Sequence, residues 1–398
     1  MPDVSSLAVW VADTRAGILA REQRQEYVFA YSPGSEAGSQ VSLTMPVRLQ
    51  SWVSRDLHPI FQMNLPEGAL LEAIRRAIAK VIGADSLTIL KVTGGNQVGR
   101  NRFSLPDEES PHSAEHPESL EQLLTYPDTK DLFHELVNKY ALRSGISGVQ
   151  PKVLLEATER ATLASSCYIV KSWGTDYPGL AANEYFCMTA ARRAGLPTPE
   201  FFLSDNGGLF IMRRFDIAPD GAFIGFEDMC SLQALGTAQK YLSSYERVAK
   251  SIRDFVSGEH LLKAREQFFS TLVLSVMVRN GDAHLKNFGV LYSSTPGTVT
   301  IAPVYDVVTT TAYIKNDVPA LSLAGTKKWW LRKILERFAI SYLSLPPALV
   351  SITFSRLADA VTETRQLIPG YIADHPDFRE TGERMMAEWD QGVNGLIE

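Results

Sequence analysis

The densest group of chemically active side chains lies in the segment VMVRNGDAHLKNFGVLY, residues 276–292. Nine consecutive positions of this segment hold the polar side chains of Arg279, Asn280, Asp282, His284, Lys286 and Asn287. Apolar stretches flank the group on both sides, which predicts a loop held rigidly between two buried elements. A turn needs Gly, Asn and Asp, whereas this loop also holds a histidine, a lysine and a second asparagine. A charged surface turn between two core elements is the alternative interpretation.

A further acidic residue, Asp306, follows about twenty residues later in the sequence TIAPVYDVVTT. Its neighbours are mostly apolar, and burying a carboxylate is costly unless it is paired or binds a cation. The pattern therefore indicates a functional carboxylate. The alternative is an aspartate that makes a turn at the end of a strand.

Together, the two segments indicate phosphoryl transfer. That chemistry requires a carboxylate that orients or deprotonates the attacking hydroxyl, oxygen ligands for Mg²⁺, and a lysine on the phosphates. Asp282 and Asn287 have the spacing of the catalytic aspartate and the metal-binding asparagine of protein kinases. Asp306 then takes the position of the second metal ligand.

Upstream elements supply the remaining parts of such a site. Lys171 ends the predicted strand SSCYIVK, and Glu184 lies on the helix predicted over residues 180–195. This is the arrangement of a strand lysine paired with a helix glutamate. For Glu184, the alternative is a charge favoured by the dipole at a helix N-terminus. The glycine-rich segment SGISGVQPK, residues 144–152, precedes both, where a phosphate-binding loop is expected.

These motifs resemble the HipA family, the serine/threonine-kinase toxins of bacterial HipBA toxin–antitoxin modules. The motifs that carry the resemblance are SGVQPK (147–152), IVKSW (169–173), NEYFCM (183–188), RRFD (213–216), RNGDAHLKN (279–287) and PVYD (303–306). NLPEG, residues 64–68, resembles a motif of the family's small N-terminal domain, so the resemblance spans nearly the whole chain. Ordinary protein kinases place His-Arg before the catalytic Asp and use Asp-Phe-Gly later, whereas here His284 follows the Asp and two valines follow Asp306.

The resemblance implies a role for each of these residues. Asp282 is the expected catalytic base, and His284 and Lys286 complete the catalytic loop, with Lys286 able to neutralise the transferring phosphoryl group. Asn287 and Asp306 are expected to hold Mg²⁺. The residues expected to bind ATP are Ser147, Gly148, Val149, Gln150, Lys152, Lys171, Glu184 and the hinge residues Arg213, Arg214 and Phe215.

Ser147 is also the candidate regulatory phosphosite, because the family's glycine-rich loop carries serines that can be autophosphorylated. A dianionic phosphate cannot share this loop with the phosphates of ATP. A serine that merely caps a turn is the alternative interpretation.

The resemblance further implies an ATP- and Mg-dependent serine/threonine protein kinase that acts as the toxin of a HipBA-type module. Its implied target is an aminoacyl-tRNA synthetase, the glutamyl enzyme by family resemblance, whose phosphorylation inhibits translation and induces dormancy. The implied partner is a HipB-like helix-turn-helix antitoxin, and DNA contact is mainly indirect, through that antitoxin.

Two alternatives to this function stay open. One is a related kinase with another synthetase or a small molecule as substrate. The other is a catalytically inactive module that binds the antitoxin and DNA. The intact Asp282, Asn287, Asp306 and Lys171 argue against the inactive module, since a binding module needs none of the four.

The helices and strands expected around these residues indicate an α+β fold. Its first part is a small N-terminal α/β domain over residues 1–105. Strands are expected at residues 7–12 and 27–31, with turn signals at Ala16-Gly17 and Pro33-Gly34. An amphipathic helix is expected over residues 66–83, with Pro66 near its start and Gly83 at its end.

A bilobal protein-kinase-like domain is expected over residues 119–398, after an exposed linker at 106–118 that is rich in proline and acidic residues. Its mixed N-lobe covers about residues 119–215, and a mostly helical C-lobe covers about 216–398. The strands expected in the N-lobe lie at residues 153–156, 165–173, 201–204 and 208–216.

Composition narrows the class of protein. The 398 residues carry a net charge of −6, which argues against a surface built throughout for binding phosphate. The three cysteines show no CxxC spacing, which is typical of reduced thiols. No secretory signal is expected, and the most apolar stretch, residues 268–278, is too short to span a bilayer. The sequence therefore predicts a cytoplasmic protein without a membrane segment.

Overall fold

The structure is a computed structural model of the chain. It describes residues 4–22, 26–67, 71, 74–75, 85–95, 97–111, 119–127, 132, 135, 160–164, 167–173 and 176–397. Most of the helix predicted over residues 66–83 lies outside the described residues, as do residues 112–118 of the predicted linker and the strand predicted at 153–156. The glycine-rich segment with Ser147, Gly148, Val149, Gln150 and Lys152 also lies outside them.

The N-terminal part is an antiparallel sheet with the strand order β4-β3-β2-β1-β5. Its strands are β1 (Ser6–Val11), β2 (Thr14–Arg21), β3 (Tyr27–Tyr31), β4 (Trp52–Ser54) and β5 (Asn101–Ser104). Among the described residues of this part, the helices are α1 (Pro59–Gln62) and α3 (Ser86–Thr93), and the 3-10 helix η1 (Ala37–Ser39) lies between β3 and β4. The buried faces of the strands and helices share one apolar core that includes Leu7, Phe29, Phe61 and Phe103.

Two of the strand predictions are confirmed here, but one turn prediction is wrong. Ala16 and Gly17 lie inside β2, and the turn comes earlier, at Ala12, which has a φ of 51°. A side chain at Gly17 would place its Cβ 2.2 Å from the carbonyl oxygen of Ala30 on β3. This glycine therefore permits close strand pairing instead of reversing the chain. The turn predicted at Pro33-Gly34 is present, with Gly34 at a φ of 80°.

The next sheet is antiparallel, with the order β6-β7-β9-β8. Its strands are β6 (Arg160–Ala164), β7 (Tyr168–Trp173), β8 (Phe201–Leu203) and β9 (Leu209–Arg213), with α4 (Leu120–Thr125) before them. The helix α7 (Leu180–Arg193) connects β7 to β8 and ends at Gly195, which adopts a φ of 73° ahead of two prolines. The predictions of β7, β8, β9 and this helix are confirmed.

The C-terminal part is mostly helical, as predicted, but it also contains a sheet that the sequence pattern did not predict. Its strands β10 (Gly225–Asp228), β11 (Gly289–Tyr292) and β12 (Val299–Ile301) pair antiparallel in that order. The α-helices are α8 (Met229–Leu232), α9 (Tyr245–Phe255), α10 (Leu261–Met277), α11 (Arg332–Ser341), α12 (Pro347–Arg365), α13 (Ile368–Asp374) and α14 (Arg379–Ile397). The 3-10 helices are η3 (Thr237–Gln239), η4 (Gly258–His260), η5 (Leu285–Asn287), η6 (Thr310–Ala312) and η7 (Pro376–Phe378).

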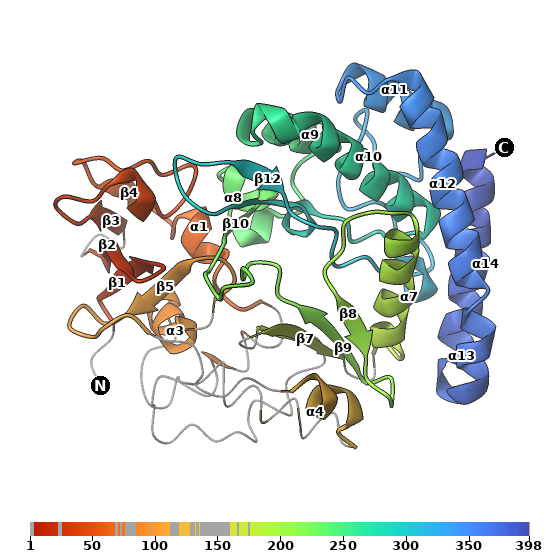
Figure 1. The fold of residues 1–398 in the computed structure, drawn as a ribbon, viewed down its shortest axis with the longest axis horizontal. Coiled ribbons are helices and arrows are strands. Elements are labelled where there is room, and N and C mark those ends of the chain that lie inside the picture. The colour runs from red at the N-terminus through yellow and green to blue at the C-terminus, as the bar shows by residue number, and fades with distance from the viewer. Residues whose placement is uncertain are drawn as a thin grey trace.

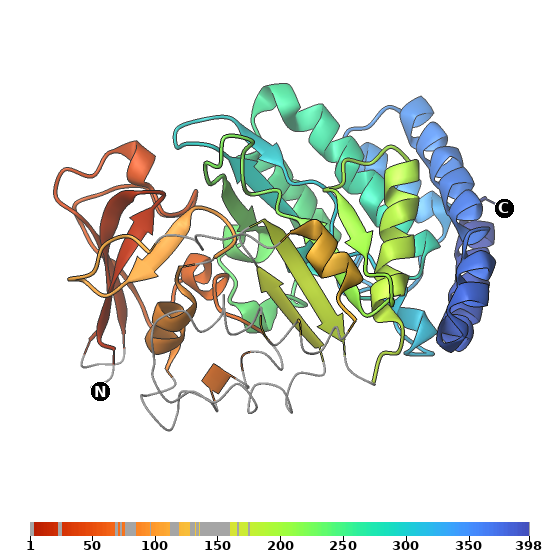
Figure 2. The same ribbon diagram turned by 60° about the horizontal axis from the view of Figure 1, so that its bottom comes forward.

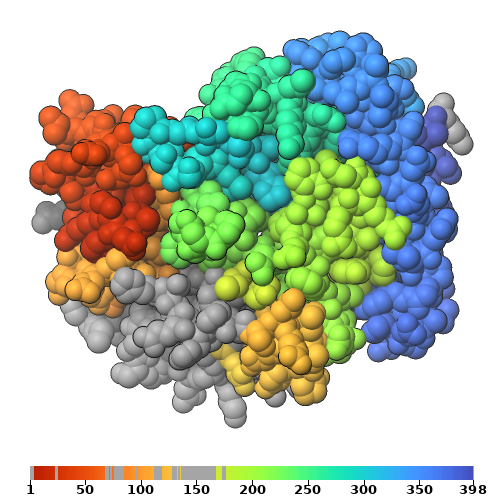
Figure 3. All heavy atoms as spheres, in the orientation of Figure 1, coloured from red at the N-terminus to blue at the C-terminus, as the bar shows by residue number. Residues whose placement is uncertain are grey.

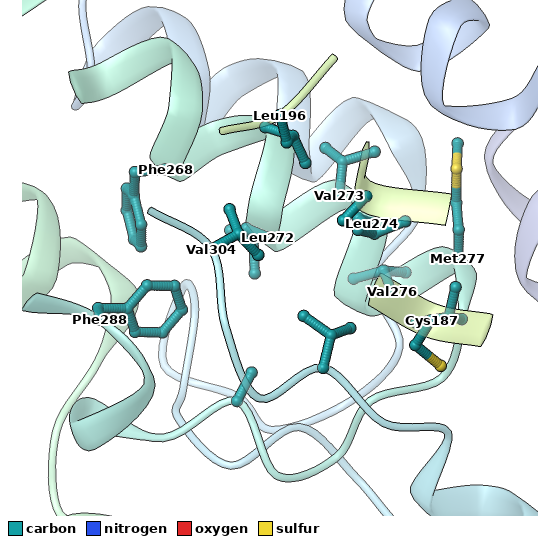
Figure 4. Packing of buried hydrophobic residues seen from close by; sticks show 14 of the residues in the cluster. Cys187, Leu196, Phe268, Leu272, Val273, Leu274, Val276, Met277, Phe288 and Val304 are labelled. Atoms are coloured by element: carbon teal, nitrogen blue, oxygen red, sulfur yellow. The ribbon is translucent and has the colours of Figure 1, made fainter. Parts of the chain in front are cut away.

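Helix α10 forms the centre of the C-terminal core. Twelve of its residues are buried, including Phe268, Leu272 and Met277, so the helix is covered on most of its sides. Figure 4 shows these side chains packed with Phe288 and Val304. Within the described part of the chain, no helix combines the length and apolar character needed to cross a bilayer.

The three parts lie side by side. In Figure 1 the N-terminal sheet is at one end and helices α12 to α14 are at the other, with the middle and C-terminal sheets between them. Figure 2 shows β7 and β9 between the N-terminal sheet and α7. Figure 3 shows the N-terminal part packed directly against the segment around β10 to β12. Buried hydrogen bonds join these two parts, such as the 2.7 Å bond from Ser42 Oγ to Glu227 Oε2.

Candidate active site

The polar loop after α10 is held between buried elements. The chain leaves α10 through Arg279, which adopts a φ of 57°, and Asn280 is buried with its amide N–H bonded to the carbonyl of Ser275 at 2.7 Å. Asn280 Oδ1 accepts the Asp282 N–H at 3.1 Å, a short-range bond that shapes the turn. The loop then enters η5 and pairs into β11. Burial on both sides fixes the position of the Asp282 backbone.

Asp282 is the one carboxylate among residues 279–287, and solvent reaches it. Its side chain is 24% exposed, and Oδ1 accepts the hydroxyl proton of Tyr241 at 2.7 Å. His284 Nε2 lies 3.9 Å from the same oxygen, and the Tyr241 ring meets the His284 ring edge-on. Burial lowers the pKa of His284 below its usual range, more strongly than Asp282 raises it. A neutral His284 therefore packs beside a carboxylate that solvent can reach.

Asn287 and Asp306 meet at the base of the site. Asn287 Nδ2 donates to Asp306 Oδ2 at 2.7 Å and to the main-chain oxygen of Asp306 at 3.3 Å. Asp306 adopts a φ of 61°, a conformation that non-glycine residues rarely use and that is found at functional sites. Carboxylate and amide oxygens are the ligands that Mg²⁺ prefers. Asn287 Oδ1 accepts the N–H of His284 at 3.1 Å, so the amide turns its nitrogen toward Asp306. The two residues lie together as a shared magnesium site requires, and the amide and the carboxylate would have to exchange these bonds for the metal ion.

Lys171 joins the two lobes at the same place. Its Nζ lies 2.7 Å from Glu184 Oε1 on α7 and 2.5 Å from Asp306 Oδ1. Burial works to lower the pKa of Lys171, but the carboxylates of Asp306 and Glu184 outweigh it, so the pKa is raised. The lysine is therefore charged and placed beside the candidate metal ligand. Glu184 and Lys171 are brought together as their elements predicted.

Asn183, the residue before Glu184, also holds α7 against the segment after Asp306, and it was not predicted as a site residue. Asn183 Oδ1 accepts the N–H of Thr309 at 2.8 Å, and its Nδ2 donates to the Thr309 carbonyl at 3.0 Å. Trp389 Nε1 donates to Thr309 Oγ1 at 2.7 Å. These bonds tie α7 and α14 to the segment that follows Asp306. Asn183 lies within the motif NEYFCM, which was the available signal.

Lys286 is held by two carboxylates that were not predicted as site residues. Its Nζ lies 2.5 Å from Glu67 Oε1 and 3.8 Å from Asp228 Oδ2. Burial works to lower the pKa of Lys286, but Asp228 and Glu67 outweigh it and raise the pKa. Glu67 belongs to the motif NLPEG of the N-terminal part, which was noted without a role in the site.

The side chains of the first two predicted hinge residues, Arg213 and Arg214, both form ion pairs within the protein. Arg213 is exposed and pairs with Glu200 at 3.0 Å. The Arg214 side chain is fully buried, pairs with Asp216 at 2.5 Å and donates to the carbonyl of Gln97 at 2.6 Å. Any contact of Arg214 with adenine would therefore have to use its main chain.

Phe215 lies beside the catalytic elements. Its ring stacks on Tyr305, with 5.3 Å between the ring centres. The Tyr305 hydroxyl donates to the carbonyl oxygen of Lys286 at 2.7 Å. Of the three hinge side chains, this one is therefore linked through Tyr305 to the catalytic loop.

The arrangement has the parts needed to act on a phosphorylated nucleotide. It combines an accessible carboxylate, an adjacent carboxylate and amide whose oxygens could serve a divalent cation, and a charged lysine beside them. The residues predicted in the glycine-rich segment, 147–150 and 152, cannot be placed relative to these parts because they lie outside the described residues.

Comparisons with known proteins agree with this geometry. Residues 7–104 match the family model described as the HipA N-terminal domain, and residues 144–367 match the HipA-like C-terminal domain. The protein of Sinorhizobium fredii named "Putative kinase Y4mE" is 26% identical over 339 residues, which cover 78% of each chain. A second kinase-named protein of that organism, Y4dM, is 29% identical over 212 residues, which cover 47% of this chain and 50% of Y4dM. The match thus spans only about half the length of Y4dM.

A solved structure resembles the whole chain. It is that of the toxin–antitoxin system HipA, HipB and operator DNA complex of Shewanella oneidensis MR-1, and the matching chain has a TM-score of 0.68 at 15% identity. The superposition covers 97% of both chains, so the fold is shared throughout. The larger of the two family matches spans more than half of this chain. The chain therefore belongs to the HipA family.

Proposed function

We propose that the chain is an ATP- and Mg²⁺-dependent serine/threonine protein kinase that acts as the toxin of a HipBA-type module. The observation that carries the proposal is the convergence on Asp306, whose two carboxylate oxygens accept from Lys171 at 2.5 Å and from Asn287 at 2.7 Å. Asp306 therefore links Lys171, on the strand β7, to the second candidate metal ligand, Asn287.

In the proposed reaction, the acceptor hydroxyl attacks the γ-phosphorus of ATP, an O–P bond forms, and the bond to the β-phosphate oxygen breaks to release ADP. Asp282 accepts the hydroxyl proton, because it is the exposed carboxylate of the loop. Asn287 and Asp306 would hold Mg²⁺, which supplies charge neutralisation on the phosphates when bound. Lys171 binds phosphate oxygens, and Glu184 holds that lysine in place.

Transfer and nucleotide binding, measured separately, test this proposal. Purified protein with radiolabelled Mg-ATP should label itself or an acceptor protein, and Asp282→Asn should abolish labelling while retaining Mg-ADP binding in calorimetry. Asp306→Asn should weaken binding in the presence of Mg²⁺. A protein that neither binds nucleotide nor transfers phosphate would contradict the proposal and favour an inactive binding module.

The target and the partner are further parts of the proposal. We expect an aminoacyl-tRNA synthetase, the glutamyl enzyme by family resemblance, as the acceptor and a HipB-like helix-turn-helix protein as the antitoxin. Support comes from the fold shared with a HipA solved with HipB and operator DNA. Phosphoproteomics after induction of the chain, compared with its Asp282→Asn form, would identify the acceptor. Growth arrest that persists in the Asp282→Asn form would contradict kinase toxicity.

Ser147 stays the proposed regulatory phosphosite. Phosphosite mapping after incubation with Mg-ATP should find it modified. Modification confined to other residues would contradict this assignment.

A further inference from the structure

The end of α1 and the residues that follow it in the N-terminal part pack against the C-terminal part. Gln62 Oε1 accepts the N–H of Thr237 at 3.1 Å, and Met63 Sδ lies 3.4 Å from the N–H of Asp228. These contacts bring residues 62–67 against the chain that leads from β10 through η3. The last of these residues, Glu67, reaches the active site.

Glu67 joins two lysines from different segments of the C-terminal part. Its carboxylate lies 2.5 Å from Lys286 Nζ and 3.0 Å from Lys240 Nζ. The Glu67 side chain is 35% exposed, that of Lys286 is 15% exposed and that of Lys240 is 23% exposed. Solvent therefore screens these ion pairs only in part. A lysine has four rotatable side-chain bonds, and the carboxylate restricts the position of its ammonium group.

The second lysine connects Glu67 to the catalytic aspartate. The carbonyl oxygen of Lys240 accepts the N–H of Leu285 at 3.2 Å, within the catalytic loop. The next residue, Tyr241, donates its hydroxyl to Asp282 at 2.7 Å. Residues 240–241 therefore contact the loop at both Asp282 and Leu285, and Glu67 fixes the lysine side chain of this short segment.

We propose that Glu67 is a positioning residue of the active centre. It holds Lys286 directly and holds the segment 240–241, and through them it orients the catalytic loop. The N-terminal part thus completes the kinase site. This inference rests on the proposed kinase function. The alternative role for Glu67 is inhibitory: its ion pair would keep Lys286 away from the nucleotide. In that case, removing the Glu67 carboxylate would speed phosphoryl transfer.

The variant Glu67→Gln tests this role, with Ser42→Ala as its matched control. Ser42 bonds Glu227 across the same boundary between parts but contacts neither lysine. Glu67→Gln should lower kcat about 10- to 100-fold, the effect of losing a hydrogen bond to a charged group, with the KM for ATP changed by about twofold or less. Ser42→Ala should leave kcat within about twofold of the unmodified chain.

Amide hydrogen exchange gives a readout that does not require transfer. Glu67→Gln should speed exchange in residues 236–242 and 279–288, and Ser42→Ala should not. An unchanged or raised kcat in Glu67→Gln would overturn the inference, and so would faster exchange spread over the whole N-terminal sheet in both variants. If the unmodified chain transfers no phosphate, the proposed function fails, while the exchange pattern still decides whether Glu67 orders the loop.

Discussion

Replacing Lys171 by methionine tests the ion-pair cluster at the centre of the site. Methionine keeps most of the side-chain length and removes the charge. In the structure the ammonium lies between Glu184 and Asp306, at 2.7 and 2.5 Å. The Glu184 side chain is 0% exposed and the Asp306 side chain is 23% exposed. The substitution therefore removes the cation from a carboxylate that water cannot solvate.

The magnitude follows from these exposures. Breaking a buried ion pair by removing one partner costs about 3–5 kcal/mol, and most of this cost falls on Glu184. Asp306 contributes less because solvent and the Asn287 amide reach it. Lys171→Met should therefore lower the free energy of unfolding by about 3 kcal/mol, which moves the urea midpoint by about 1 M at a slope of about 3 kcal/mol/M.

A second substitution separates stability from function. Lys171→Met combined with Glu184→Gln removes both charges and should recover about 2 kcal/mol of the loss, while Mg-ADP binding should stay weak because the lysine proposed to bind phosphate is gone. Lys250→Met is the control, since its pair with Asp254 is exposed and contributes about 0.5 kcal/mol or less.

Urea unfolding followed by circular dichroism and calorimetry with Mg-ADP measure the two effects. Lys171→Met that unfolds at the same midpoint as the control would contradict a cost from the buried Glu184 charge, and so would a double variant that is no more stable than the single one. Unchanged nucleotide affinity in Lys171→Met would refute the assigned role of the lysine.

Three further changes probe the loop and the N-terminal part. Asp282→Asn should lower transfer about 100-fold or more in a phosphorylation assay and leave nucleotide affinity unchanged. Gly281→Ala should also impair transfer, because its Cβ would lie 2.0 Å from Asp317 Oδ2, whereas Gly258→Ala meets nothing within 4 Å and should be neutral. Burial lowers the pKa of His58 to about 4 from 6.5. His58 is therefore neutral when folded, and stability should fall by up to about 3 kcal/mol as the pH drops from 6.5 through 4. His58→Asn should flatten this dependence in urea titrations at several pH values.

Local patterns in the sequence were enough to predict most of the catalytic elements. The loop with Asp282 and Asn287 is recognisable because its polar residues stand between two apolar runs. Lys171 and Glu184 are only thirteen positions apart, on a strand and the helix that follows it, so their meeting follows from short-range geometry. The kinase pattern made Asp306 the expected second metal ligand, and the family resemblance gave it the same role.

Contacts between distant segments could not be predicted in this way. Glu67 and Lys286 are 219 positions apart, and no periodicity links a carboxylate after α1 to a lysine in the catalytic loop. The sheet of β10 to β12 was missed for a related reason, since its strands have only three or four residues and gain their stability from pairing across the fold. The Gly17 turn was misassigned because a glycine that permits close strand approach carries the same local signal as one that reverses the chain.

The charges of the site indicate what must accompany a nucleotide that binds there. Within the described part of the chain, the ion pairs of the site connect four carboxylates with three lysine ammonium groups. The carboxylates are Glu67, Asp228, Glu184 and Asp306, and the lysines are Lys171, Lys240 and Lys286. A fifth carboxylate, Asp282, accepts a hydrogen bond from Tyr241. A polyanion that approached these groups alone would meet an excess of negative charge at short range. We therefore expect nucleotide to bind together with a cation, and Asn287 and Asp306 lie where such a cation would offset this repulsion. The site thus has an acidic excess, as the whole chain does with its net charge of −6, and we expect a divalent cation to accompany the nucleotide. Nucleotide affinity that is the same in EDTA and in Mg²⁺ would contradict this conclusion.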